Sequence, residues 1–86
     1  MTTEGRPCPC CGNLTFGKPP GSGSYDICPV CFWEDDPVQF DDPDYAGGAN
    51  VVSLTQARRN FAEFGASERR FMRNVRPATS EEKGQG

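Results

Sequence analysis

Apolar side chains recur in the C-terminal half of the chain at the spacing of an α-helix. Ser53 comes just before this stripe with Gln56 three residues later, which is a capping box, and Gly65 follows it as a stop signal. The pattern therefore predicts an amphipathic helix that begins at Ser53 and ends at Gly65. Its apolar face, at positions i, i+3, i+7 and i+10, consists of Leu54, Ala57, Phe61 and Phe64.

The following segment predicts a second, shorter helix. Ser67 is a suitable N-cap, and Pro77 would end the helix. Its buried side would consist of Phe71, Met72 and Val75. We therefore expect a C-terminal helical hairpin.

Shorter apolar runs in the N-terminal half are typical of strands. Leu14–Phe16 predicts one strand, a Gly/Pro-rich loop follows, and Ser24–Ile27 predicts the returning strand. Alternation would place Tyr25 and Ile27 on one face of this pair. The pattern predicts a β-hairpin.

Two cysteine pairs carry the clearest chemical signal. The sequence reads Cys-Pro-Cys-Cys-Gly over 8–12 and Cys-Pro-Val-Cys over 28–31. Two Cys-x-x-Cys pairs give the spacing of a zinc ribbon, because a two-residue gap lets one tight turn present both thiolates to a tetrahedral ion. Iron is the alternative metal, since four thiolates also suit a mononuclear iron centre. We expect two zinc knuckles that hold one Zn²⁺ through Cys8, Cys11, Cys28 and Cys31.

Cys10 is left over by this assignment and lies beside Cys11 on the first turn. One interpretation is a small apolar turn residue next to the metal. The other is a thiol whose reactivity the site tunes, although the charge of the site and nearby N–H donors would act on it in opposite directions. The sequence leaves the role of Cys10 open.

Composition narrows the function. The chain has 86 residues, five cysteines and no histidine. A domain this small buries little apolar surface, so a bound metal would supply much of its stability. The absence of histidine excludes Ser-His-Asp and Cys-His catalysis and zinc sites built on imidazole. We expect a protein that is not an enzyme.

The same composition bears on location. No stretch approaches the ~18 apolar residues of a membrane span. The N-terminus shows no apolar signal region, and an odd number of cysteines cannot all form disulfides. We expect reduced thiols, no membrane partner and a cytoplasmic location.

Charge is divided between two segments. Six of the eleven residues over 34–44 are acidic, whereas six arginines lie between Arg58 and Arg76, and the net charge is -3. We expect the two blocks to pair within the chain or to face solvent, and we expect no nucleic-acid partner. The aromatic pair Phe32 and Trp33 should cover the metal and the hairpin.

These elements predict one zinc-binding domain over residues 8–77. Residues 1–7 would form a flexible N-terminus, and residues 78–86, which lack an apolar anchor, a disordered tail. The fold class is a small metal-stabilised α+β domain. It would consist of a zinc-ribbon or rubredoxin-like β-hairpin with two zinc knuckles, followed by the C-terminal helical hairpin.

Four motifs resemble a known family. They are Cys-Pro-Cys-Cys-Gly at 8–12, Ile-Cys-Pro-Val-Cys-Phe-Trp-Glu-Asp-Asp-Pro-Val-Gln at 27–39, Asp-Pro-Asp-Tyr-Ala-Gly-Gly-Ala-Asn at 42–50 and Ser-Leu-x-x-Ala-Arg-x-Asn-Phe at 53–61. Together they resemble the bacterial CPCC cysteine-rich family over most of the chain. The resemblance implies a small zinc-binding protein for which the family offers no established activity.

We therefore interpret the chain as a small protein whose zinc is structural and which acts as a protein-interaction module. The sequence identifies neither the protein partner nor the oligomeric state. The alternatives are a nucleic-acid-binding zinc ribbon and a rubredoxin-like or thiol redox protein.

Overall fold

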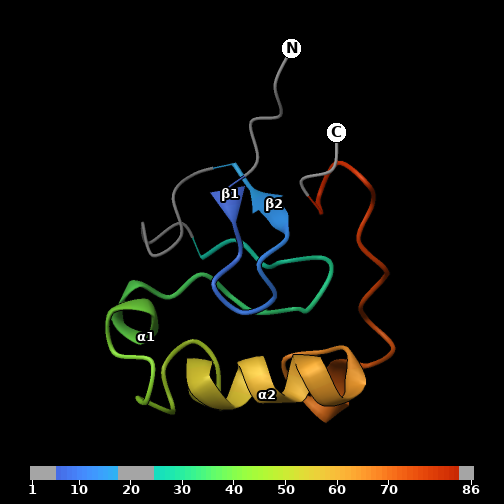
Figure 1. Cartoon of the computed structure of the whole chain (residues 1–86). Coiled ribbons are helices and arrows are strands. Elements are labelled where there is room, and N and C mark those ends of the chain that lie inside the picture. The colour runs from blue at the N-terminus through green and yellow to red at the C-terminus, as the bar shows by residue number, and fades with distance from the viewer. Residues whose placement is uncertain (1–5, 18–24, 84–86) are drawn as a thin grey trace.

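The computed structural model describes residues 6–17 and 25–83 of the chain. Its elements are β1 (Arg6–Pro7), β2 (Leu14–Phe16), α1 (Pro37–Asp41), α2 (Leu54–Phe64) and the 3-10 turn η1 (Arg69–Phe71). The protein is thus a small α+β fold. Its longest element, α2, lies across one side of the two cysteine turns (Figure 1).

Each cysteine pair lies in the turn of its own short hairpin. Strands β1 and β2 pair antiparallel around the first turn, with a bulge between Arg6 and Pro7. Around the second turn, Ile27 forms an antiparallel bridge with Glu34. Both turns are tight, and a tight turn brings its own flanks together.

The predicted strand pairing was therefore wrong. Strand β2 pairs with Arg6–Pro7, in the segment expected to be flexible, and not with Ser24–Ile27. Ser24 itself lies outside the described residues. Tyr25 and Ile27 do not share a buried face, because both are about half exposed.

Helix α2 begins and ends where its sequence signals predict. The Ser53 hydroxyl accepts a hydrogen bond from Gln56 N–H (3.1 Å), and Gly65 follows with a left-handed φ of 84°. The first two residues of its apolar stripe, Leu54 and Ala57, are fully buried. Phe61 is partly buried and packs against the same core.

The second helix of the predicted helical hairpin is absent from the described residues. In its place stands η1, and Met72, expected inside, is 45% exposed. Main-chain contacts explain the difference: Ser67 N–H donates to Cys31 C=O (2.7 Å), and Arg76 N–H donates to Pro29 C=O (3.2 Å). Both ends of the segment are thus tied to the second cysteine turn, and tertiary contacts outweigh a weak local helix preference.

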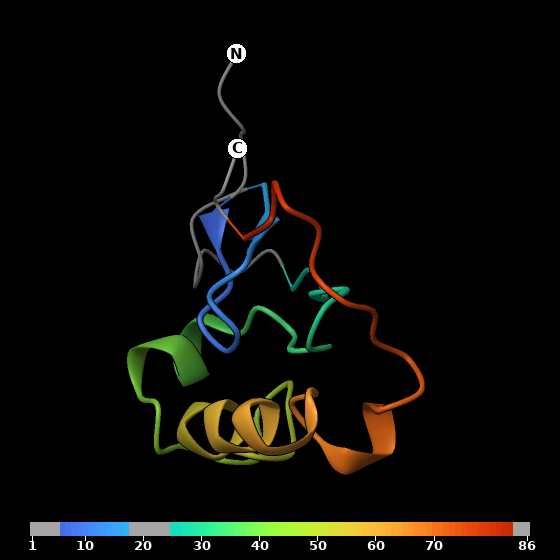
Figure 2. The same ribbon diagram turned by 45° about the vertical axis from the view of Figure 1, so that its right-hand side comes forward.

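The core is built around the cysteines. Its largest fully buried side chains are Trp33, Phe16 and Leu54. Trp33 belongs to one cluster with four of the five cysteines, so its predicted place over the cysteine site is confirmed. Seen after a 45° turn, α2 lies along one side of the molecule, and β1, β2 and the first cysteine turn lie on the other (Figure 2).

Part of the segment expected to be a disordered tail lies against the hairpin. Leu14 N–H of β2 donates to Glu82 C=O (2.6 Å). The Glu82 carboxylate is held by two Arg76 nitrogens at 2.8 and 2.7 Å. Over residues 78–83 the chain therefore returns to β2, as its path in Figure 1 also shows.

Candidate metal centre

Four cysteine sulfurs converge between the two hairpin turns. Any two of these Sγ atoms lie within 4.8 Å, and Cys11 is half-buried while the other three are buried. The site residues predicted from the sequence are thus brought together as one group. They are Cys8, Cys11, Cys28 and Cys31.

The two turns share one backbone pattern. In the first, Cys8 N–H donates to Asn13 C=O (2.8 Å) and Gly12 N–H to Cys8 C=O (2.7 Å). In the second, Cys28 N–H donates to Trp33 C=O (2.9 Å) and Phe32 N–H to Cys28 C=O (2.7 Å). The spacing of these bonds along the chain is identical in both turns.

Phe32 takes the backbone conformation that glycine takes in the first turn. Its φ is 71°, close to the 79° of Gly12, although a bulky residue pays roughly 1 to 2 kcal/mol there. The Phe32 ring contacts the ring of Phe71 with centroids 4.7 Å apart. This contact offsets part of the strain, because aromatic pairs of this kind stabilise by about 0.5 to 1.5 kcal/mol.

The sulfur spacing fits a tetrahedral metal ion. Bonds of about 2.3 Å from zinc to sulfur place tetrahedral sulfurs about 3.8 Å apart. The distance is 3.6 Å from Cys8 Sγ to Cys31 Sγ and 3.7 Å from Cys11 Sγ to Cys28 Sγ. A disulfide would need about 2.05 Å, and all five cysteines are free.

Polar donors point at two of the sulfurs. Thr15 Oγ1 donates to Cys28 Sγ (3.1 Å), and Cys10 N–H donates to Cys8 Sγ (3.4 Å). Such donors orient metal-bound thiolates and spread their charge. They provide the outer support that a four-thiolate site requires.

The clustered thiols change one another's protonation. Hydrogen bonds from Cys11, then from Cys31 and Cys8, lower the pKa of Cys28. Hydrogen bonding with Cys10, followed by the other clustered thiols and burial, raises the pKa of Cys31. Four thiolates this close together repel one another, and a bound cation would stabilise them.

Cys10 lies beside this group without belonging to it. Its side chain is 8% exposed and packs in the cysteine core. Its N–H donates to Cys8 Sγ, and its thiol raises the pKa of Cys31. Burial agrees with the interpretation of Cys10 as a small apolar turn residue, whereas the effect on Cys31 agrees with a thiol coupled to the site.

Cys11 offers the route by which a metal could enter. It lines a cavity of about 660 Å³ whose wall includes Phe61 of α2 and Val75. The other three grouped cysteines are at most 1% exposed. An entry path is one of the features a real metal site must have.

A second polar cluster lies next to the centre and was missed by the sequence analysis. Asp36 caps α1 through Val38 N–H (2.8 Å) and also accepts from Ala49 N–H (2.8 Å). The Asn50 side-chain amide accepts from Glu34 N–H and donates to Glu34 C=O, both at 2.9 Å. It thus satisfies the Glu34 backbone as the main chain of a neighbouring strand would. This cluster attaches the loop before α2 to the strand that leaves the second cysteine turn.

The acidic segment is therefore not a wholly solvated face. Asp35 and Asp36 are 0% and 4% exposed. Asp36 followed by Pro37 is an N-cap and first-turn signature that could have indicated α1. Thr15 and Asn50 carry no comparable local signal, because their partners lie more than ten residues away.

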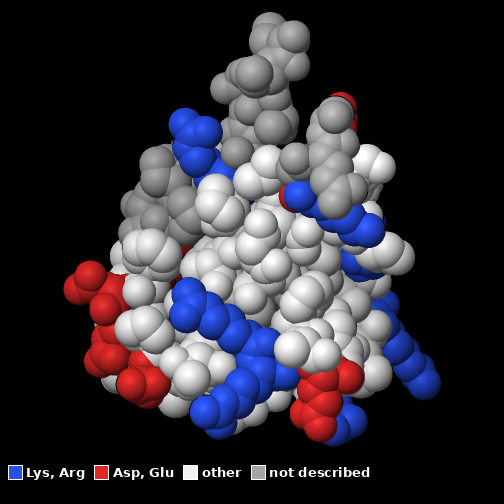
Figure 3. All heavy atoms as spheres, in the orientation of Figure 1, with Lys and Arg blue, Asp and Glu red and all other residues white. Residues whose placement is uncertain are grey.

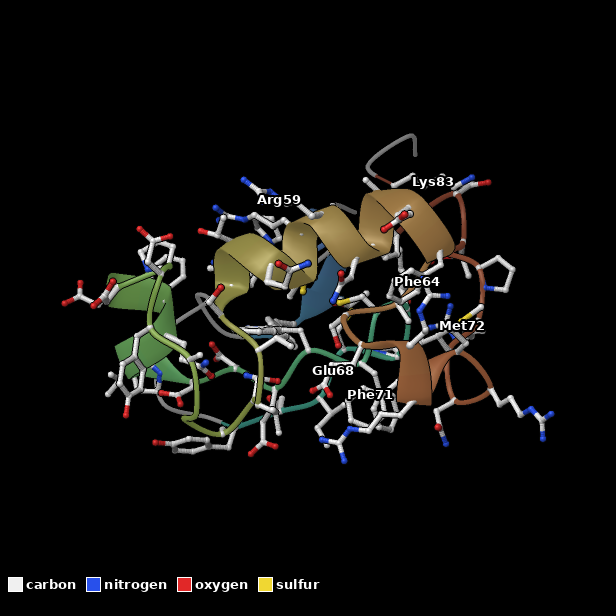
Figure 4. The ribbon with its side chains drawn as sticks, turned by 90° about the horizontal axis from the view of Figure 1, so that it is seen from below. Arg59, Phe64, Glu68, Phe71, Met72 and Lys83 are labelled. Atoms are coloured by element: carbon white, nitrogen blue, oxygen red, sulfur yellow. The ribbon has the colours of Figure 1, made fainter. Side chains whose placement is uncertain are left out.

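Two arginines form ion pairs outside the acidic segment. Among the described residues, ion pairs join Arg70 to Glu68 (2.8 Å) and Arg76 to Glu82 (2.7 Å), outside the segment 34–44. Figure 4 shows Glu68, Phe71 and Met72 together at η1, beyond the end of α2 that carries Phe64. Arg70 and Arg76 thus pair with acidic residues near them in the sequence.

The described part of the chain contains no helix that is long and apolar enough to cross a membrane.

A comparison with curated proteins finds no match. The family model for cysteine-rich CPCC proteins matches residues 6–82, which includes both cysteine turns, α1, α2 and the returning segment. The chain therefore belongs to the cysteine-rich CPCC family.

Proposed function

We propose that this chain is a small zinc protein in which one Zn²⁺ is structural and the folded surface acts as a protein-interaction module. The observation that carries the metal assignment is the convergence of four cysteine sulfurs within 4.8 Å. The ligands would be Cys8, Cys11, Cys28 and Cys31. Four protein ligands leave no open coordination position, which is the mark of a structural zinc site and not of a catalytic one.

Burial supports the structural role. Cys28 and Cys31 are fully buried, and both lie in the cluster that contains Trp33. A metal at this point would hold the centre of the core together. The proposal accordingly assigns no catalytic residue, and free thiols favour a reducing location such as the cytoplasm.

The metal assignment can be tested by native mass spectrometry with metal analysis. We expect one Zn²⁺ per chain and loss of that ion when Cys8, Cys11, Cys28 or Cys31 is changed to serine. The matched control is Cys10→Ser, which should retain zinc because Cys10 lies outside the group. A red, iron-loaded protein would support the rubredoxin-like alternative, and equal zinc loss from Cys10→Ser and Cys11→Ser would refute the ligand set.

The interaction role can be tested separately. Affinity capture with the zinc-loaded chain should enrich a protein and not nucleic acid. Sub-micromolar, salt-dependent binding of DNA or RNA would instead support the nucleic-acid alternative.

A further inference from the structure

Two large apolar side chains are exposed on α1. Val38 is 56% and Phe40 is 42% exposed, and they are two of seven exposed large apolar side chains among the described residues. Together with Pro37, Asp41 and Asp42 they line a shallow hollow of about 540 Å³. We call these five residues the α1 surface. Exposed apolar surface with a polar rim is typical of interaction sites.

The α1 surface is held rigidly from behind. Gln39 lies between the two exposed apolar residues in sequence but is fully buried. Its Nε2 donates to the carbonyls of Tyr45 (3.0 Å), Asn50 (3.2 Å) and Val52 (3.0 Å). A five-residue helix would not be stable alone. This anchoring fixes the backbone of α1 before any partner binds, which lowers the entropic cost of binding.

The rim of the α1 surface is acidic. Asp41 and Asp42 line the hollow and are exposed, and Asp44, two residues further along the chain, is exposed as well. Neither ion pair between described residues involves them. Figure 3 shows acidic side chains gathered at the end of the molecule that carries α1, while basic side chains lie over α2. Such a rim attracts cationic groups and repels acidic ones.

The geometry points to α1 as the docking site for a basic segment of a protein partner, in which an apolar side chain is flanked by Lys or Arg. The apolar side chain would occupy the hollow between Val38 and Phe40, and the flanking cations would meet Asp41 and Asp42. This inference rests on the proposed interaction function and specifies the partner's chemistry.

The test is a titration of the zinc-loaded full chain, labelled with ¹⁵N, with three synthetic peptides. The first is Lys-Arg-Leu-Trp-Lys-Arg, the second replaces the four cations with glutamate, and the third replaces Leu-Trp with Ala-Ala. We expect the first peptide to shift the amide signals of residues 38–42 and the other two to leave them unchanged. Raising the salt concentration should weaken the first interaction.

Matched variants separate specific docking from general attraction. Asp41→Asn with Asp42→Asn should weaken binding of the first peptide about fivefold at low salt, and Phe40→Ala should weaken it about tenfold or more. The control is Glu63→Gln with Glu81→Gln, which removes the same charge from exposed positions elsewhere. It should change the affinity by less than about twofold.

Three outcomes would overturn the inference. They are equal binding of the acidic peptide, equal effects of the two double variants, and amide shifts at 38–42 that depend on protein concentration without peptide, which would indicate a second copy as occupant. Native mass spectrometry and amide dispersion are recorded on the same sample. If the chain is folded, holds one zinc ion and does not bind the basic peptide, this docking site alone is refuted. If the chain holds no zinc, the proposed metal is refuted.

Discussion

Gly48 shows how one missing side chain sets the geometry next to α1. A Cβ at this position would lie 2.5 Å from Asp36 Oδ2 and 3.1 Å from two Gln39 carbons. Both neighbours are buried and hydrogen-bonded, so neither can move away freely. We expect Gly48→Ala to lower the free energy of unfolding by about 2 kcal/mol, measured by urea denaturation.

Gly17 provides the matched control. Gly17→Ala adds the same methyl group where no atom of the described residues lies within 4 Å, and neither glycine has a positive φ. This substitution should be neutral within about 0.5 kcal/mol. Equal effects at the two positions would show that the loop over Asp36 is loosely packed.

On the scale of the elements, the side-chain amide of Gln39 joins α1 to the loop that precedes α2. Its Nε2 faces three carbonyl oxygens, and its Oε1 accepts from Asn50 N–H (3.0 Å) and Asn50 Nδ2 (2.9 Å). Gln39→Glu keeps the shape but turns an oxygen toward those carbonyls. We expect a loss of about 2 to 4 kcal/mol at pH 7, measured by chemical denaturation.

The loss should shrink at lower pH, since the introduced carboxyl group could again donate a hydrogen bond once it is protonated. Gln56→Glu on the exposed face of α2 is the control and should stay within about 0.5 kcal/mol of the parent. If the two variants were equally stable, the buried amide network would not be what holds α1.

The returning segment gives a pH-dependent prediction. Hydrogen bonds from Arg76 and from Thr79 N–H lower the pKa of Glu82 from 4.5 to about 2. Since the folded pKa is depressed, this contact contributes fully above the unfolded value and is lost as pH falls from about 4.5 toward 2. Glu82→Gln should loosen the segment already at pH 7, seen as faster exchange of the Leu14 amide, which donates to Glu82 C=O.

Glu81→Gln, at the exposed neighbouring position, should leave the exchange of Leu14 unchanged. The side-chain carboxyl of Glu82 can be followed by NMR in the same pH series. Titration of this carboxyl at its ordinary pKa would mean that the Arg76 contact does not persist in solution.

Which elements could be predicted depends on how local their causes are. The cysteine group and α2 follow from spacings of a few residues: Cys-x-x-Cys turns, the Ser53 cap and the Gly65 stop. The prediction of a second helix failed because main-chain hydrogen bonds join Ser67 and Arg76 to the second cysteine turn, which is distant in the sequence. Asn50 was missed for the same reason, since its bonds to Glu34 span sixteen residues.

On the scale of the whole molecule, three arginines contact other parts of the fold. Arg58 Nε donates to Pro9 C=O (2.8 Å), which ties α2 to the first cysteine turn. Arg69 and Arg70 lie over the rings of Phe64 and Phe71 at 4.6 and 4.5 Å. These contacts support our expectation that nucleic acid binds weakly, because the same guanidinium groups would have to leave aromatic rings and backbone partners.

The last prediction concerns removal of the metal from the whole chain. Three of the four grouped cysteines are at most 1% exposed, and α2 is attached to their turns through Arg58. Helix α2 has eleven residues, too few to be stable alone. Structural zinc contributes roughly 10 to 16 kcal/mol in small domains, comparable with the ~5 to 15 kcal/mol stability of a whole domain.

A strong chelator should therefore abolish the helical circular dichroism signal together with the dispersed amide spectrum, and added Zn²⁺ should restore both. Cys10→Ser should need the same chelator concentration as the parent. Helix α2 persisting after complete zinc removal would show that Leu54, Ala57 and Trp33 can form a core without the metal.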